Sequence, residues 1–167
     1  EGRGHLHRVR TLDRSVLIGA AGANVTALPT NDGVAAFDAL TSDANNMRNL
    51  SRSAFSHMGV GVAEDANGYI YVVQLFAQVD GELAEPLPAS LPSISRRQAN
   101  FAEAGFTPLG WELVDDNGRM VDRGLGRRIQ ADLAPGASAF LTIKAELNGD
   151  TYALKGPRVT GVNTAEQ

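Results

Sequence analysis

The sequence predicts an α+β fold, with helices and a β-hairpin in the first half and a small antiparallel β-sandwich in the second. Apolar residues recur at helical spacing between residues 33 and 51. Two β-rich runs between residues 58 and 77 flank an Asn-Gly turn, which is typical of a hairpin. After residue 93, short β-rich runs alternate with Asn-Gly and Pro-Gly turns about every 8–12 residues, the spacing expected of a sandwich.

Composition excludes several classes of function. The 167 residues include 15 basic and 19 acidic side chains, and a net charge of −4 does not fit a nucleic-acid-binding protein. No apolar run reaches the roughly 20 residues that a membrane-spanning helix needs. Cysteine is absent, which excludes disulfides, thiolate metal ligands and thiol nucleophiles. Because the chain starts at Glu1, we expect a processed chain whose signal segment is not present here.

The N-terminal part of the chain is expected to contain an arm and two helices. Residues 1–14 are polar, rich in Arg and His and without an apolar period, which predicts a loosely held arm. The first helix starts near Gly33 and carries three apolar residues at helical spacing: Val34, Phe37 and Leu40. Either Ser42 or Asp43 can cap the second helix, because both side chains accept hydrogen bonds from free backbone N–H groups.

The clearest predicted element is the hairpin, with strands over residues 58–63 and 69–77. Gly59 and Gly61 fall on one face of the first strand, because side chains alternate along a strand. Glycine within a strand often marks close approach by another segment, so we expect a neighbour to pack tightly on this face.

The second half is expected to be a separate β-domain. Three prolines and little periodicity over residues 80–92 predict a linker after a first domain at residues 15–79. An Ig-like sandwich should follow over residues 93–162, and residues 163–167 are expected to form a tail.

Four motifs in the first half follow one another in the order and at the spacing of motifs in a known protein family. They are Gly22-Ala23-Asn24-Val25, Ser42-Asp43-Ala44-Asn45-Asn46-Met47-Arg48-Asn49-Leu50, Phe55-Ser56-His57-Met58-Gly59-Val60-Gly61-Val62-Ala63 and Tyr69-Ile70-Tyr71-Val72-Val73-Gln74-Leu75-Phe76-Ala77. Together they resemble the bacterial branch of the CAP superfamily (cysteine-rich secretory, antigen 5, pathogenesis-related 1). The resemblance implies a CAP-like α-β-α sandwich, truncated at its N-terminus because the family's first helix has no counterpart here.

The resemblance also implies a degenerate site. The family's cleft holds two histidines and two acidic residues that can bind a divalent metal. Ala23 stands at the position of one of those acids and Asn46 at that of one histidine, and neither is a good substitute as a ligand. We therefore expect no metal, no cofactor and no catalytic residue. The candidate binding residues of the remaining cleft are Ala23, Asn24, Asn46, Asn49 and His57.

Three of these residues also have structural interpretations. Asn46 and Asn49 share a helix face, where they can hydrogen-bond a ligand. Alternatively, the Asn49 amide holds its helix against the neighbouring strand. His57 is either a ligand or general base, or an ordinary residue at the end of a strand.

The sequence predicts a non-catalytic, extracytoplasmic module that binds a partner or serves as a structural subunit of a cell-envelope or membrane-associated assembly. The compartment, periplasmic or secreted, follows from the resemblance, because family members are exported. Two alternatives stay open: a carrier of a lipid or small apolar ligand in the CAP cleft, and a hydrolase with an unrecognised site. A protein partner or homo-oligomer is expected, because strand 69–77 is apolar on both faces and the helices over residues 33–51 can cover only one.

Overall fold

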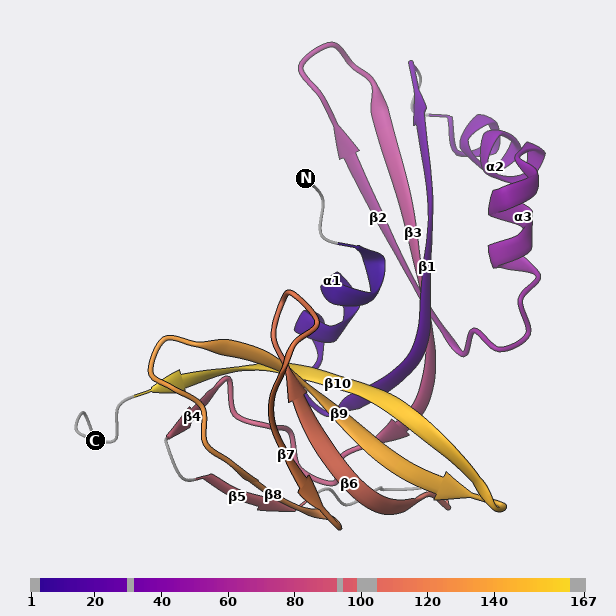
Figure 1. Cartoon of the computed structure of the whole chain (residues 1–167). Coiled ribbons are helices and arrows are strands. Elements are labelled where there is room, and N and C mark those ends of the chain that lie inside the picture. The colour runs from indigo at the N-terminus through magenta and orange to yellow at the C-terminus, as the bar shows by residue number, and fades with distance from the viewer. Residues whose placement is uncertain (1–3, 30–31, 93–94, 99–104, 163–167) are drawn as a thin grey trace. The chain divides into compact units, whose positions relative to one another are not determined.

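The structure, a computed structural model, describes residues 4–29, 32–92, 95–98 and 105–162. It is α+β and mostly antiparallel, as predicted (Figure 1). In chain order its elements are α1 (His5–Leu12), β1 (Val16–Leu28), α2 (Gly33–Ser42), α3 (Ala44–Leu50), β2 (His57–Glu64), β3 (Ile70–Glu82), β4 (Ser90–Pro92), β5 (Ser95–Gln98), β6 (Thr107–Val114), β7 (Met120–Leu125), β8 (Arg128–Ala131), β9 (Ser138–Leu147) and β10 (Asp150–Val162). The tail expected at residues 163–167 lies outside the described residues.

Eight of the described strands form one sheet, and this corrects the expected sandwich. Their order is β2-β3-β1-β10-β9-β6-β7, with β4 paired in parallel to β10, while β5 and β8 form a separate two-stranded ladder. The reason is a long-range pairing: β1 lies antiparallel to β10, with Ile18 opposite Lys155. A strand from the first half thus pairs with the strands expected to form a sandwich over residues 93–162, and the described strands form one eight-stranded sheet beside the short β5–β8 ladder.

By its internal contacts the chain divides into two compact units. Unit 1 comprises Glu1–Leu6 and Ala20–Gln78, and unit 2 comprises His7–Gly19 and Val79–Gln167. The strands β1 and β3 contribute residues to both units.

Two aspartates define the helices of unit 1. The Asp32 side chain accepts a hydrogen bond from the backbone N–H of Val34 at 2.9 Å and caps α2. Asp43 ends α2 and caps α3 by accepting from two backbone N–H groups, which decides between the two predicted caps. Of the three apolar residues predicted to form the inner face of α2, Leu40 is buried, whereas Val34 and Phe37 are exposed.

The predicted hairpin is confirmed. β2 and β3 pair antiparallel from His57 opposite Ala77 to Glu64 opposite Ile70. The turn closes where the Asp65 N–H donates to the Tyr69 carbonyl at 3.0 Å, and Gly68 adopts the positive φ of 78° that this turn requires.

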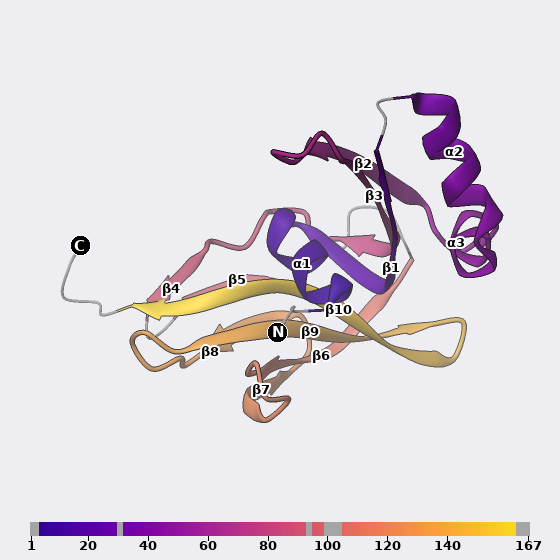
Figure 2. The same ribbon diagram turned by 90° about the horizontal axis from the view of Figure 1, so that it is seen from above.

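The helices of unit 1 lie on one side of β1 in both views (Figure 1, Figure 2). They cover the face of β3 that carries Val72 and Phe76, and Phe55 stacks on Phe76 with ring centroids 5.5 Å apart. The opposite face of the hairpin carries Gly59 and Gly61. A Cβ atom added at Gly59 or Gly61 would meet nothing within 4 Å, so the expected close packing on these glycines is wrong.

The core of unit 2 lies on one face of its sheet. Its buried residues are Leu17, Leu83, Leu87, Leu91, Trp111, Leu113, Ile129, Ala131, Leu133, Ala139, Leu141, Ile143, Ala145, Leu154 and Val159. Three of them, Leu83, Leu87 and Leu91, come from the proline-rich segment expected to be a linker. Because leucines gain free energy on burial, this segment packs into the core and does not run free between domains.

The N-terminal segment expected to be a loose arm forms α1 and is anchored to the other face of the unit 2 sheet by Arg10. Its Nε donates to the Gly156 carbonyl and its Nη2 to the Leu141 carbonyl, both at 2.6 Å. The guanidinium carbon lies 4.3 Å from the centroid of the Phe140 ring. The Gly156 carbonyl is available because the β9–β10 register shifts between Lys155 and Arg158. Burial lowers the pKa of Arg10 to about 10, so it stays charged at neutral pH.

Replacing Arg10 with methionine should destabilise the protein by about 2–4 kcal/mol, because two carbonyls lose a charged donor. The matched variant Arg8→Met, on an exposed position of the same helix, should change the free energy of unfolding by less than about 0.5 kcal/mol. Urea denaturation followed by Trp111 fluorescence measures both. Equal stabilities of the two variants would contradict the anchor.

A second pair of variants compares two glycines. Gly61→Ala should leave the stability unchanged or raise it by up to about 1 kcal/mol, because its Cβ enters open space and the backbone loses freedom when unfolded. Gly124→Ala should cost about 1–3 kcal/mol, because its Cβ would lie 2.5 Å from the indole Nε1 of Trp111. Thermal unfolding by circular dichroism checks both values, and a large loss for Gly61→Ala would mean that its face is covered.

Candidate functional site

A network of side-chain amides joins α3 to β1 and β3 in unit 1. Asn24 is 1% exposed, and its Nδ2 donates to the Asn46 carbonyl and to Gln74 Oε1, both at 3.1 Å. Asn49 Nδ2 donates to Asn24 Oδ1 at 2.8 Å and to the Ala23 carbonyl at 3.2 Å. Buried amides cost free energy unless they are hydrogen-bonded, so this network fixes the helix on the sheet.

The structure therefore brings four of the five predicted cleft residues together. Ala23 and Asn46 take part through their backbone carbonyls, and Asn24 and Asn49 through their side chains. The Asn49 amide thus holds its helix against the neighbouring strand β1, which is the structural interpretation of this residue given above. The Ala23 side chain has no atom that could bind a metal.

His57 lies at the start of β2, outside the amide network. It is exposed and lines a hollow of about 220 Å³ together with Asn49, Phe55 and Phe76. Its Nδ1 lies 3.0 Å from Ser56 Oγ. A serine–histidine pair needs a third group that orients the histidine, and no carboxylate in the described part of the chain contacts His57. Among those same residues, no three metal-binding side chains gather at one place.

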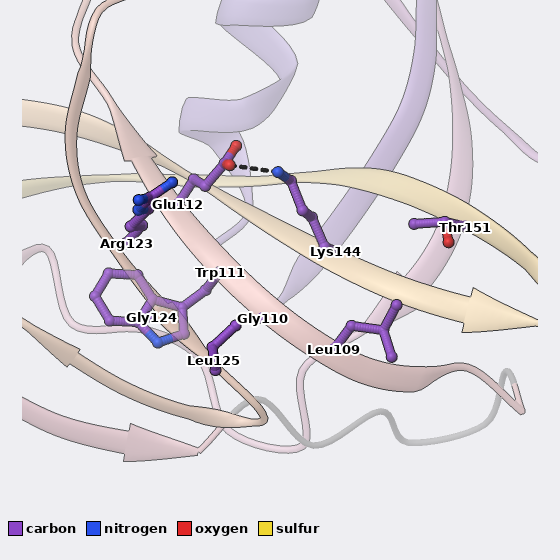
Figure 3. Close-up of a pocket in the computed structure, with 9 residues that line it drawn as sticks. All are labelled: Leu109, Gly110, Trp111, Glu112, Arg123, Gly124, Leu125, Lys144 and Thr151. Atoms are coloured by element: carbon purple, nitrogen blue, oxygen red, sulfur yellow. Dashed lines mark hydrogen bonds and ion pairs between the residues drawn. The ribbon is translucent and has the colours of Figure 1, made fainter.

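A larger pocket, of about 520 Å³, lies in unit 2 and was not predicted from the sequence (Figure 3). The residues that line it come from β6, β7, β9 and β10: Leu109, Gly110, Trp111, Glu112, Arg123, Gly124, Leu125, Lys144 and Thr151. Lys144 Nζ hydrogen-bonds Glu112 Oε1 across the sheet. The β6–β7 register places Glu112 opposite Arg123 and Trp111 opposite Gly124.

Trp111 and Gly124, which lie opposite each other on β6 and β7, line this pocket. The Trp111 side chain is buried, and its Nε1 donates to the Arg128 carbonyl at 2.7 Å. The indole lies so close to Gly124 that no side chain fits there. A sequence signal existed in the glycines at positions 110 and 124, but its meaning depends on the strand register.

Comparison of the chain with protein-family models, curated proteins and solved structures finds no match. Among the described helices, none combines the length and apolar character needed to cross a membrane. The function therefore has to be inferred from the surfaces and contacts described above.

Asn49→Ala should destabilise the protein by about 2–3 kcal/mol, because Asn24 Oδ1 and the Ala23 carbonyl lose their donor. The exposed neighbour Asn45→Ala is the matched control and should cost less than about 0.5 kcal/mol. Chemical denaturation followed by far-UV circular dichroism measures the difference. If Asn49→Ala were as stable as Asn45→Ala, the amide network would not hold the helix.

Proposed function

We propose that this chain is a non-catalytic structural and binding module that pairs with a second copy of itself through the free edge of β2. The proposal keeps the truncated CAP-like assignment of residues 15–79 and the extracytoplasmic location, both of which rest on the four motifs. The observation that carries it is the composition and exposure of β2.

β2 ends the strand order of the sheet, so one of its edges has no neighbour among the described strands. The Asp65 N–H bonds the Tyr69 carbonyl, and hydrogen-bonded pairs alternate along an antiparallel ladder. Odd-numbered residues of β2 therefore bond β3. Met58, Val60 and Val62 direct their N–H and C=O groups to the free edge.

Features that usually protect an edge strand are missing from β2. It contains no proline and no lysine, and its pairing with β3 has no bulge. Val60 and Val62 are 57% and 67% exposed, and Met58 is similarly exposed. An unprotected edge with apolar side chains favours pairing with another strand.

The strand is also complementary to itself. In an antiparallel pair with a two-fold axis at Val60, Met58 lies opposite Val62 and Gly59 opposite Gly61. Apolar side chains then meet apolar side chains on one face, and glycines meet glycines on the other. The residues whose polar backbone groups are free form the hydrogen-bonded pairs, which suits a symmetric dimer.

Val60→Pro tests the pairing, because proline removes a donor that faces the free edge and is tolerated on an edge strand. We expect the wild-type protein to be a dimer and Val60→Pro a monomer of similar thermal stability, as measured by analytical ultracentrifugation and circular dichroism. Val25→Lys, at a 55% exposed position of β1, is the control and should stay dimeric.

A crosslink tests the register. The chain has no cysteine, so Val60→Cys introduces a single thiol that faces its own copy across the axis. Opposed residues in such a pair have Cα atoms about 5.5 Å apart, within disulfide reach. Val60→Cys should form a disulfide dimer on mild oxidation and Glu64→Cys should not. A monomeric wild type, or equal crosslinking of both variants, would overturn the proposal.

A further inference from the structure

The pocket of unit 2, which we call the β6–β7 pocket, lies on the face of the sheet opposite the core. Trp111, Leu113 and Ile143 point into the core, so alternation directs Glu112 and Lys144 to the other face. Arg123 lies opposite Glu112 in the register of the neighbouring strand β7, so its side chain is on the same face. Three charged side chains from three strands therefore converge on one hollow, as Figure 3 shows.

The pocket has an apolar part beside these charges. Leu125 is 91% exposed, and Leu109 also presents its side chain to solvent. The Gly126 N–H donates to the Leu109 carbonyl at 2.7 Å, which ties the two leucine-bearing segments together. Gly110 and Gly124 line the pocket with backbone atoms and add no side chain to it. The volume of about 520 Å³ lies within the roughly 300–1,000 Å³ of small-molecule sites.

Within the described part of the chain, one cation of the pocket has no ionic partner. Lys144 is paired with Glu112, whereas the Arg123 guanidinium contacts no carboxylate among the described residues. The lining thus carries a net charge of +1 in a chain of net charge −4. Burial lowers the pKa of Lys155 and the charge of Arg10 lowers it further, whereas Glu112 raises it and Lys144 lowers it, so these charged groups lie near one another. A concave site with such a positive field attracts anions.

We infer that the β6–β7 pocket binds an amphipathic organic anion, with its carboxylate at Arg123 and its apolar tail over Leu109 and Leu125. Arginine binds carboxylates through two parallel hydrogen bonds, which fixes the orientation of the ligand. The exposed leucines lose contact with water when the tail covers them. This site belongs to unit 2 and is distinct from the cleft residues predicted in unit 1.

Trp111, the single tryptophan of the chain, provides a local readout. Decanoate at concentrations below its micelle formation should give a saturable change in Trp111 fluorescence. Acetate, which lacks the tail, and decyltrimethylammonium, which reverses the charge, should give none. An equal response to decyltrimethylammonium, or no response to decanoate, would overturn the inference. A response to phosphatidylglycerol vesicles but not to decanoate would overturn it as well, because the chain would then bind a lipid surface.

Variants assign the two parts of the site. Arg123→Gln should weaken decanoate binding about tenfold or more, and Leu125→Ser should weaken it as well. Arg119→Gln is the matched control, because Arg119 pairs with Asp115 at the turn of the same hairpin and does not line the pocket. It should bind as the wild type does. Shifts of the Leu125 and Thr151 amide signals of the wild-type protein in NMR spectra provide a second measurement, and unchanged signals there would place any binding elsewhere.

Discussion

Unit 2 depends on two arginines that hydrogen-bond backbone carbonyls from distant parts of the chain. Arg10 binds the carbonyls of Gly156 and Leu141, and Arg14 binds those of Leu87, Pro88 and Arg158. An eight-residue helix such as α1 is marginal by itself in water. The charged donors attach it to the sheet and attach the proline-rich segment to β10, which completes the cover of the core. Burial lowers the pKa of both guanidinium groups, and the carbonyl dipoles and the Phe140 ring compensate for the lost water.

Local signals in the sequence predicted the local structure well. The Asn-Gly pairs at positions 67, 117 and 148 all lie in turns with a positive φ at glycine, because few other residues adopt this conformation. Asp43 caps a helix as its position before α3 suggested. The long-range structure was not predictable in the same way. The pairing of Ile18 with Lys155 joins strands 137 residues apart, and no periodicity within either strand specifies its partner.

The sites differ in the same respect. The contact of Asn49 with the neighbouring strand was one of the two interpretations that the sequence offered, whereas the sequence predicted Asn24 only as a cleft residue and not as its partner. The β6–β7 pocket could not be predicted, because Arg123 gains its position only through the register that sets it opposite Glu112. The two proposals also rest on different physics. The edge of β2 offers unpaired backbone groups, whereas the pocket offers a cation beside apolar side chains, so each surface suits a different kind of partner.

The larger part of unit 1, Ala20–Gln78, lies in the sequence between the two segments of unit 2. The chain leaves unit 2 after Gly19 along β1 and returns at Val79 along β3, and these two strands are neighbours in the sheet. Residues 20–78 therefore form a long insertion between two neighbouring strands that both extend into unit 2. Loops whose ends are adjacent can be lengthened, shortened or exchanged at small entropic cost, because their closure changes little with length. Unit 2 therefore serves as the scaffold, and the segment inserted between its two strands is a part that can be exchanged for another of different length.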